Sequence, residues 1–118
     1  MKTIKEMTAE VAQVNVEKGW RETINTFGEY CALLHSEISE ALEAWREYGL
    51  TDMTSTAVSG AGVVLDHPKP EGVGSEMADL LIRLVDTCDV LGIDLEAEYE
   101  RKLAYNRTRP YQHGGKTL

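Results

Sequence analysis

The chain has 118 residues, of which 42% are hydrophobic and 27% are charged, so it is long enough for one hydrophobic core and too short for two. We therefore expect a single domain over residues 1–118. With 20 acidic and 12 basic side chains, the net charge is −8 when the histidines are neutral. Duplex DNA and anionic membranes attract concentrated positive charge, so this balance argues against both as partners.

The first two predicted elements are amphipathic helices. Apolar residues recur at helical spacing over about 3–18, and Gly19 follows as a stop signal. A longer apolar stripe covers about 27–48 and ends at Gly49. Trp45 lies at the centre of that stripe, which predicts a place in the core.

Residues 50–74 are rich in glycine, proline and hydroxyl residues and predict a loop. A loop of this length is uncommon in a compact domain and is often functional or mobile. A third helix is expected over about 75–91 with Ser75 as its N-cap, and a fourth over about 94–107, before a tail at 110–118. Because sustained period-two alternation is missing, the pattern predicts an all-α four-helix bundle.

Two pairs of acids stand out on the second and third predicted helices. Glu37 and Glu40 are three residues apart, as are Glu76 and Asp79, so each pair shares one helix face. At about 100° per residue, both pairs lie at a similar angle from the apolar stripe of their own helix. If the two helices pack side by side, four carboxylates converge, and such a group requires hard cations such as Mg²⁺ or Mn²⁺.

The alternative is that these acids are ordinary surface charge, because single acid pairs of this spacing are frequent on solvated helix faces. We interpret the remaining acids of the same two helices in that way, as outward-facing charge. They are Glu43, Glu47, Asp86 and Asp89.

The fourth predicted helix carries a second group of polar residues. Lys102 and Asn106 are four residues apart and Arg109 follows three later, so the three project within a narrow, inward-leaning arc that suits phosphate oxygens. The alternative is a lysine at the rim of the core followed by a polar helix end. Trp20, just after Gly19, is suited either to stacking on a nucleobase or to packing at a helix junction.

Taken together, Glu37-x-x-Glu40, Glu76-x-x-Asp79 and Lys102-x-x-x-Asn106-x-x-Arg109-Pro110 resemble the all-α nucleoside triphosphate pyrophosphohydrolase superfamily, in particular its MazG-like members. The resemblance covers nearly the whole chain. It implies a bundle that hydrolyses a nucleoside triphosphate, often a deoxy one, to the monophosphate and pyrophosphate. The stretch between the two acid pairs is longer here than in most members of that family.

By this resemblance, all four acids would be ligands of Mg²⁺, or of Mn²⁺, and one of them or a neighbouring acid would orient or deprotonate the attacking water. Lys102 and Asn106 would contact the substrate, and Arg109 would assist through phosphate. The family usually works as dimers or tetramers, so we expect a homodimer or homotetramer.

Two other functions stay open. The first is a non-catalytic helical module for oligomerisation, and the second is the related branch that hydrolyses phosphoribosyl-ATP. With no apolar run near the roughly 20 residues that span a bilayer, a polar N-terminus and two cysteines, a cytoplasmic location is expected.

Overall fold

The computed structural model of the chain describes residues 1–51, 53–54 and 68–111. Most of the predicted 50–74 loop and most of the 110–118 tail lie outside the described residues. In the described part, the elements in chain order are α1 (Ile4–Glu17), α2 (Phe27–Tyr48), β1 (Met53–Thr54), β2 (Pro70–Glu71), α3 (Val73–Val90) and α4 (Leu95–Thr108). The all-α prediction is confirmed, since the strands have two residues each and pair antiparallel with each other.

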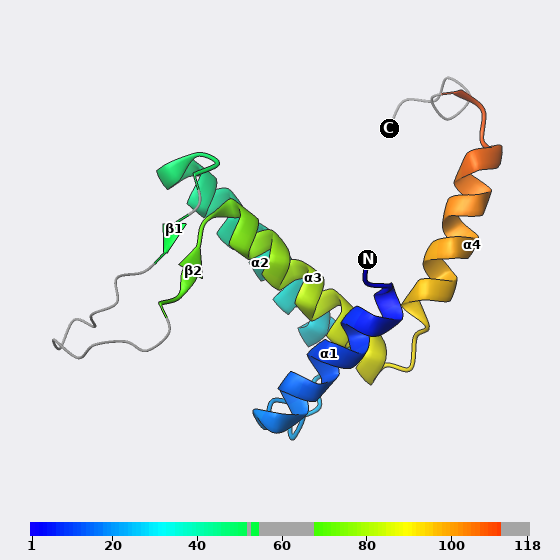
Figure 1. The fold of residues 1–118 in the computed structure, drawn as a ribbon, viewed down its shortest axis with the longest axis horizontal. Coiled ribbons are helices and arrows are strands. Elements are labelled where there is room, and N and C mark those ends of the chain that lie inside the picture. Colours follow the sequence, from blue (N-terminus) through cyan, green and yellow to red (C-terminus); the bar gives the residue numbers. More distant parts are fainter. Residues whose placement is uncertain (52, 55–67, 112–118) are drawn as a thin grey trace, which may run out of the picture.

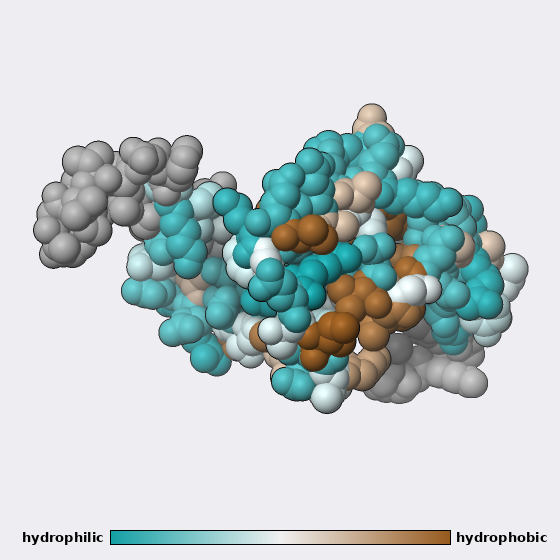
Figure 2. Space-filling model, turned by 90° about the horizontal axis from the view of Figure 1, so that it is seen from below, coloured by the Kyte–Doolittle hydropathy of each residue, from teal (hydrophilic) through white to brown (hydrophobic). Residues whose placement is uncertain are grey.

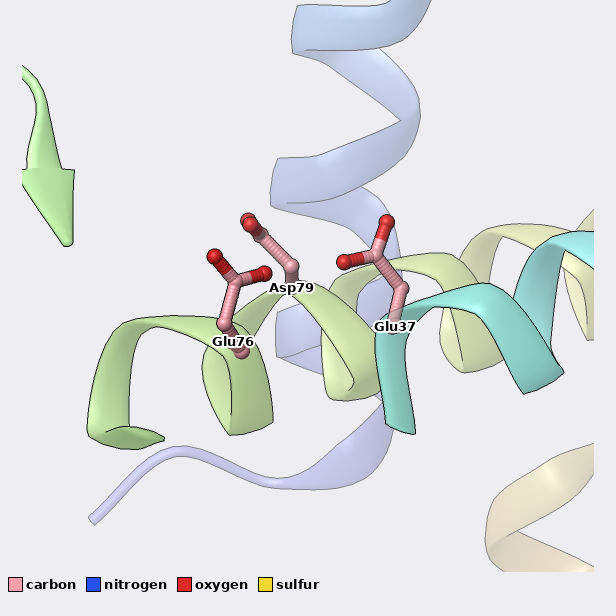
Figure 3. A group of neighbouring side chains, drawn as sticks. All are labelled: Glu37, Glu76 and Asp79. Carbon is pink, nitrogen blue, oxygen red and sulfur yellow. The ribbon is translucent and has the colours of Figure 1, made fainter. Parts of the chain in front are cut away.

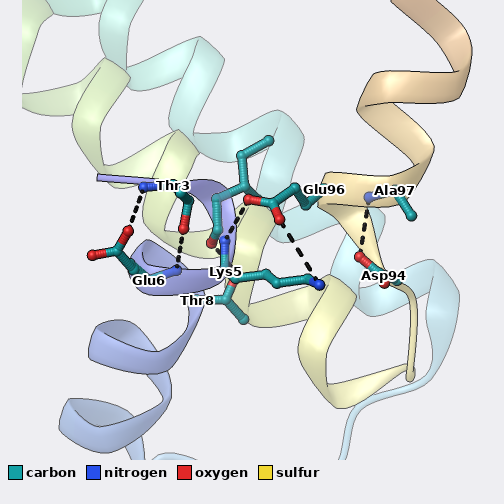
Figure 4. A network of polar contacts seen from close by, with 8 residues as sticks. Thr3, Lys5, Glu6, Thr8, Asp94, Glu96 and Ala97 are labelled. Carbon is teal, nitrogen blue, oxygen red and sulfur yellow. Dashed lines mark hydrogen bonds and ion pairs between the residues drawn. The ribbon is translucent and has the colours of Figure 1, made fainter. Parts of the chain in front are cut away.

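The first two helices begin at matched capping boxes, which explains why their bounds follow the sequence pattern closely. The backbone N–H of Glu6 donates to the Thr3 hydroxyl at 3.1 Å, and the Thr3 N–H donates to the Glu6 carboxylate at 3.1 Å (Figure 4). Thr26 and Glu29 repeat the arrangement at the start of α2. Gly49 ends α2 with a φ of 65°, a conformation that favours glycine.

The predicted N-cap of the third helix is wrong by three residues. Helix α3 begins at Val73, and its N-cap is Gly72 with a φ of 112°. Ser75 lies inside the helix, where its hydroxyl donates to the Pro70 carbonyl at 3.1 Å. The cause is the β1–β2 pairing, which holds the chain up to Glu71 and leaves the turn into the helix to the following glycine.

Helices α2 and α3 lie side by side and antiparallel, α1 packs against α3, and α4 projects away from them (Figure 1). The buried apolar residues come from α2 and α3 and are Tyr30, Ala41, Val85 and Cys88. The backbone N–H of Lys5 donates to the Glu96 carboxylate at 3.3 Å and so ties α1 to the start of α4 (Figure 4).

A closed four-helix bundle is therefore not formed by the described residues of one chain. Helix α4 has no buried residue. The radius of gyration is 17.9 Å, against about 13–14 Å for a compact chain of this length.

Much of the apolar stripe of α2 is open to solvent. Trp45 is 55% exposed, so its predicted place in the core is wrong for the single chain, and Ile38 and Leu42 are 51% and 46% exposed. Figure 2 shows apolar residues gathered at the surface of one face. Among the described residues, no helix has the length and apolar character required to cross a membrane.

Candidate metal centre and adjoining cleft

Three of the four predicted acids meet between α2 and α3. Glu37 extends from the middle of α2, while Glu76 and Asp79 extend from the first turns of α3 (Figure 3). One carboxylate oxygen from each lies within 4.8 Å of the others. The three side chains point toward one another, as the equal angular offset of the two acid pairs predicts.

Two oxygens in this group are buried without a hydrogen-bond partner. Glu37 is only 5% exposed. Its Oε1 accepts a hydrogen bond from Arg83 Nε at 2.6 Å, but its Oε2 has no partner, and neither does Oε2 of Glu76. Buried polar atoms are nearly always paired in native proteins, and a cation bound among the three acids could pair these two oxygens.

The electrostatics of the group follow from burial and crowding. The pKa of Glu76 is raised to about 7, first by burial and then by Glu40, Asp79 and Glu37. The pKa of Glu37 is lowered, first by the hydrogen bond from Arg83. Glu40 is exposed and is outside the tight trio, yet it lies close enough to act on both of the other glutamates.

The donor set fits a hard divalent cation. All candidate ligand atoms are carboxylate oxygens, which suit Mg²⁺ or Mn²⁺. Glu37, Glu76 and Asp79 could each supply one ligand atom, and Glu40 lies beside them at the solvent side. The close carboxylates repel one another, and a cation would offset this repulsion.

A cleft of about 710 Å³ adjoins the acids. Its lining includes Glu37 and Asp79 on one side and Trp20 on the connection between α1 and α2. Trp20 is 68% exposed, so its ring is available to a ligand in the cleft. This position is compatible with both interpretations of Trp20, as a base-stacking residue and as a residue at a helix junction.

Arginines and aspartates on the same cleft were not singled out by the sequence pattern. Arg21 pairs with Asp86 at 2.5 Å and with Asp89 at 2.9 Å. The interpretation as outward-facing charge is therefore wrong for Asp86, which is partly buried, whereas Asp89 is exposed as expected. A signal was present, because Arg83 and Asp86 follow Asp79 by four and seven residues and so share its helix face.

The predicted substrate residues of α4 do not approach the acids in this chain. Lys102, Asn106 and Arg109 are all exposed, and none lines the cleft. Lys102 Nζ lies 5.6 Å from the centre of the Tyr105 ring instead. The expected inward-leaning face is wrong for the single chain because α4 packs on the rest of the molecule only near its start.

Comparison with known proteins adds no family assignment. Searches against models of protein families, curated proteins and solved structures found no match for this chain.

Proposed function

We propose that the protein is a Mg²⁺-dependent nucleoside triphosphate pyrophosphohydrolase of the MazG-like kind. The observation that carries this proposal is the pair of buried, unpaired oxygens of Glu37 and Glu76 beside Asp79, at the edge of a cleft. The cleft's volume lies within the usual range of small-molecule sites, roughly 300–1,000 Å³. The products would be a nucleoside monophosphate and pyrophosphate.

The chemistry assigned to the acids follows from their surroundings. A bound divalent cation supplies neutralisation of phosphate oxygens and a lowered pKa for a coordinated water. Glu37, Glu76 and Asp79 would hold the cation, and Glu40 completes the group from the solvent side. One carboxylate of this group would accept the proton of the water that attacks a phosphorus atom of the α–β anhydride. The bond from that phosphorus to the bridging oxygen would break, which releases the nucleoside monophosphate and pyrophosphate.

Residues outside the acidic group would contact other parts of the substrate. Trp20 would stack on the nucleobase from the rim of the cleft. Lys102, Asn106 and Arg109 would contact substrate from a second copy of the chain, because α4 of the same chain carries them away from the acids. A homodimer or homotetramer would also cover the exposed apolar stripe of α2.

One observation favours a second candidate, a non-catalytic oligomerisation module. The apolar side chains exposed on α2 would be explained by association alone, with no chemistry at the acids. The two candidates differ in the metal dependence of pyrophosphate release, which only an enzyme would show.

The test is a pyrophosphate-release screen over canonical and modified nucleoside triphosphates and phosphoribosyl-ATP, with and without Mg²⁺. Wild type should release pyrophosphate from at least one nucleotide only with the metal, and Glu76→Gln should lose that release. Glu43→Gln is the matched control, since Glu43 is an exposed acid on α2 that does not line the cleft. No release from any compound, or equal release by Glu76→Gln, would overturn the proposal.

A further inference from the structure

We propose that Arg83 binds a phosphate group of the ligand in the cleft, an inference that rests on the proposed function. Arg83 lies where the acidic group and the cleft meet. Its Nε donates to Glu37 Oε1 at 2.6 Å, and the residue lines the cleft together with Asp79. A phosphate held near the acids would therefore lie next to this guanidinium.

The donors of Arg83 are only partly used. A guanidinium has five N–H donors in a fixed fork, and in the described part of the chain only Nε of Arg83 makes a hydrogen bond. The side chain is 43% exposed and lines the cleft, so a ligand in the cleft could contact it.

Arg21, which lines the same cleft, differs in this respect. Its nitrogens are taken up by Asp86 and Asp89, and its side chain is 22% exposed. Of the two arginines on this cleft, Arg83 is thus the one that has donors left for a ligand.

The charges around Arg83 indicate which chemical group of a ligand would bind there. The cleft wall near Arg83 bears Glu37, Asp79 and Asp86, which repel an anion. A phosphate needs local positive charge to enter, and the planar fork of arginine matches two phosphate oxygens at once. Arg83 would supply that charge beside the metal ligands, with Trp20 on the same cleft for an aromatic base.

The test measures binding of inorganic pyrophosphate by titration calorimetry in the presence of Ca²⁺. Arg83→Gln should weaken binding by about tenfold to a hundredfold, the range for lost charge-assisted hydrogen bonds. Arg83→Lys, which keeps the charge but not the fork, should lie between Arg83→Gln and wild type. The matched control is Arg101→Gln, because Arg101 is an exposed arginine on α4 that pairs only with Glu98 among the described residues.

A second readout separates ligand binding from a structural role. Mn²⁺ affinity, measured on each variant by electron paramagnetic resonance, should be no weaker in Arg83→Gln than in wild type, since the variant removes a cation that shares Glu37. If Arg83→Gln lost Mn²⁺ and pyrophosphate binding together, Arg83 would only hold the acids in place and the inference would fail.

The inference would also fail if Arg83→Gln bound pyrophosphate as tightly as wild type, or if wild type did not bind it. These results leave the metal-dependent release of pyrophosphate from nucleotides untouched. Conversely, Arg83-dependent pyrophosphate binding without release from any nucleotide would overturn the proposed function and support the inference.

Discussion

The interface between α2 and α3 differs from helix α4 in whether it buries polar residues. Between α2 and α3, Glu37 is buried and keeps one carboxylate oxygen without a hydrogen-bond partner. Helix α4 buries no residue and holds its cationic side chains in solvent. A buried carboxylate oxygen without a hydrogen-bond partner carries a free-energy cost, whereas an exposed lysine carries none.

The largest expected effect is on pyrophosphate release, and it distinguishes the α2–α3 interface from helix α4. Glu76→Gln should lower pyrophosphate release at least about a hundredfold, because even residues that only support metal ligands commonly cost 10–100-fold. Lys102→Ala should cost about tenfold, as one exposed phosphate contact. Steady-state rates with the best nucleotide of the screen provide the measurement. Equal losses in both variants would contradict the difference between the regions.

The same contrast should appear in stability. Val85 is 1% exposed between α2 and α3, so Val85→Ala should lower the free energy of unfolding by about 2 kcal/mol through lost burial and a cavity. Leu103 on α4 is only partly buried, and Leu103→Ala should cost about 1 kcal/mol or less. Urea unfolding followed by circular dichroism measures both. A larger loss for Leu103→Ala would show that α4 is packed in the assembled protein.

The exposed stripe of α2 offers a test of association. Replacing the half-exposed Trp45 by glutamate should raise the dissociation constant of the oligomer about tenfold or more, since a buried charge would then lie in the contact. Sedimentation equilibrium measures the change. Glu43→Gln serves as the control on the same helix and should leave the oligomer intact, and a monomeric wild type would contradict the proposed assembly.

A further expected effect is a pH dependence of the stability of the metal-free chain. Because the pKa of Glu76 is raised from 4.5 to about 7 in the fold, the folded state binds more protons than the unfolded state between these values. Stability should therefore fall as the pH rises from 4.5 toward 7 and stay level above. Glu37 acts in the opposite sense, because its pKa is lowered in the fold. Its contribution to the free energy of unfolding is present above about pH 4.5 and is lost as the pH falls below that value.

Thermal unfolding of wild type and Glu76→Gln across this range measures the slope that Glu76 contributes. The variant should lack that slope. Mg²⁺ affinity should rise with pH through about 7, because binding requires the ionised carboxylate. A Mg²⁺ affinity independent of pH would contradict the assignment of Glu76 as a ligand.

The local sequence predicted all four helices and singled out the acids that lie between α2 and α3. Thr3 with Glu6 and Thr26 with Glu29 are local capping signals, and Gly49 is a local stop, so the first two helices were predictable within a residue. The spacing of the four acids predicted that they would converge if the two helices packed side by side, and three of them, Glu37, Glu76 and Asp79, do so. The start of α3 was not predictable in this way, because it depends on a strand pairing across the loop.

The tertiary structure determines which charged side chains pair with one another. Periodicity places a side chain on one face of its helix, but it does not say whether another element covers that face. Arg83 meets Glu37, and Arg21 meets Asp86, only because α2, α3 and the α1–α2 connection come together in space. For the same reason, Trp45 and Lys102 are exposed in the described chain, although the periodicity predicts that both face inward.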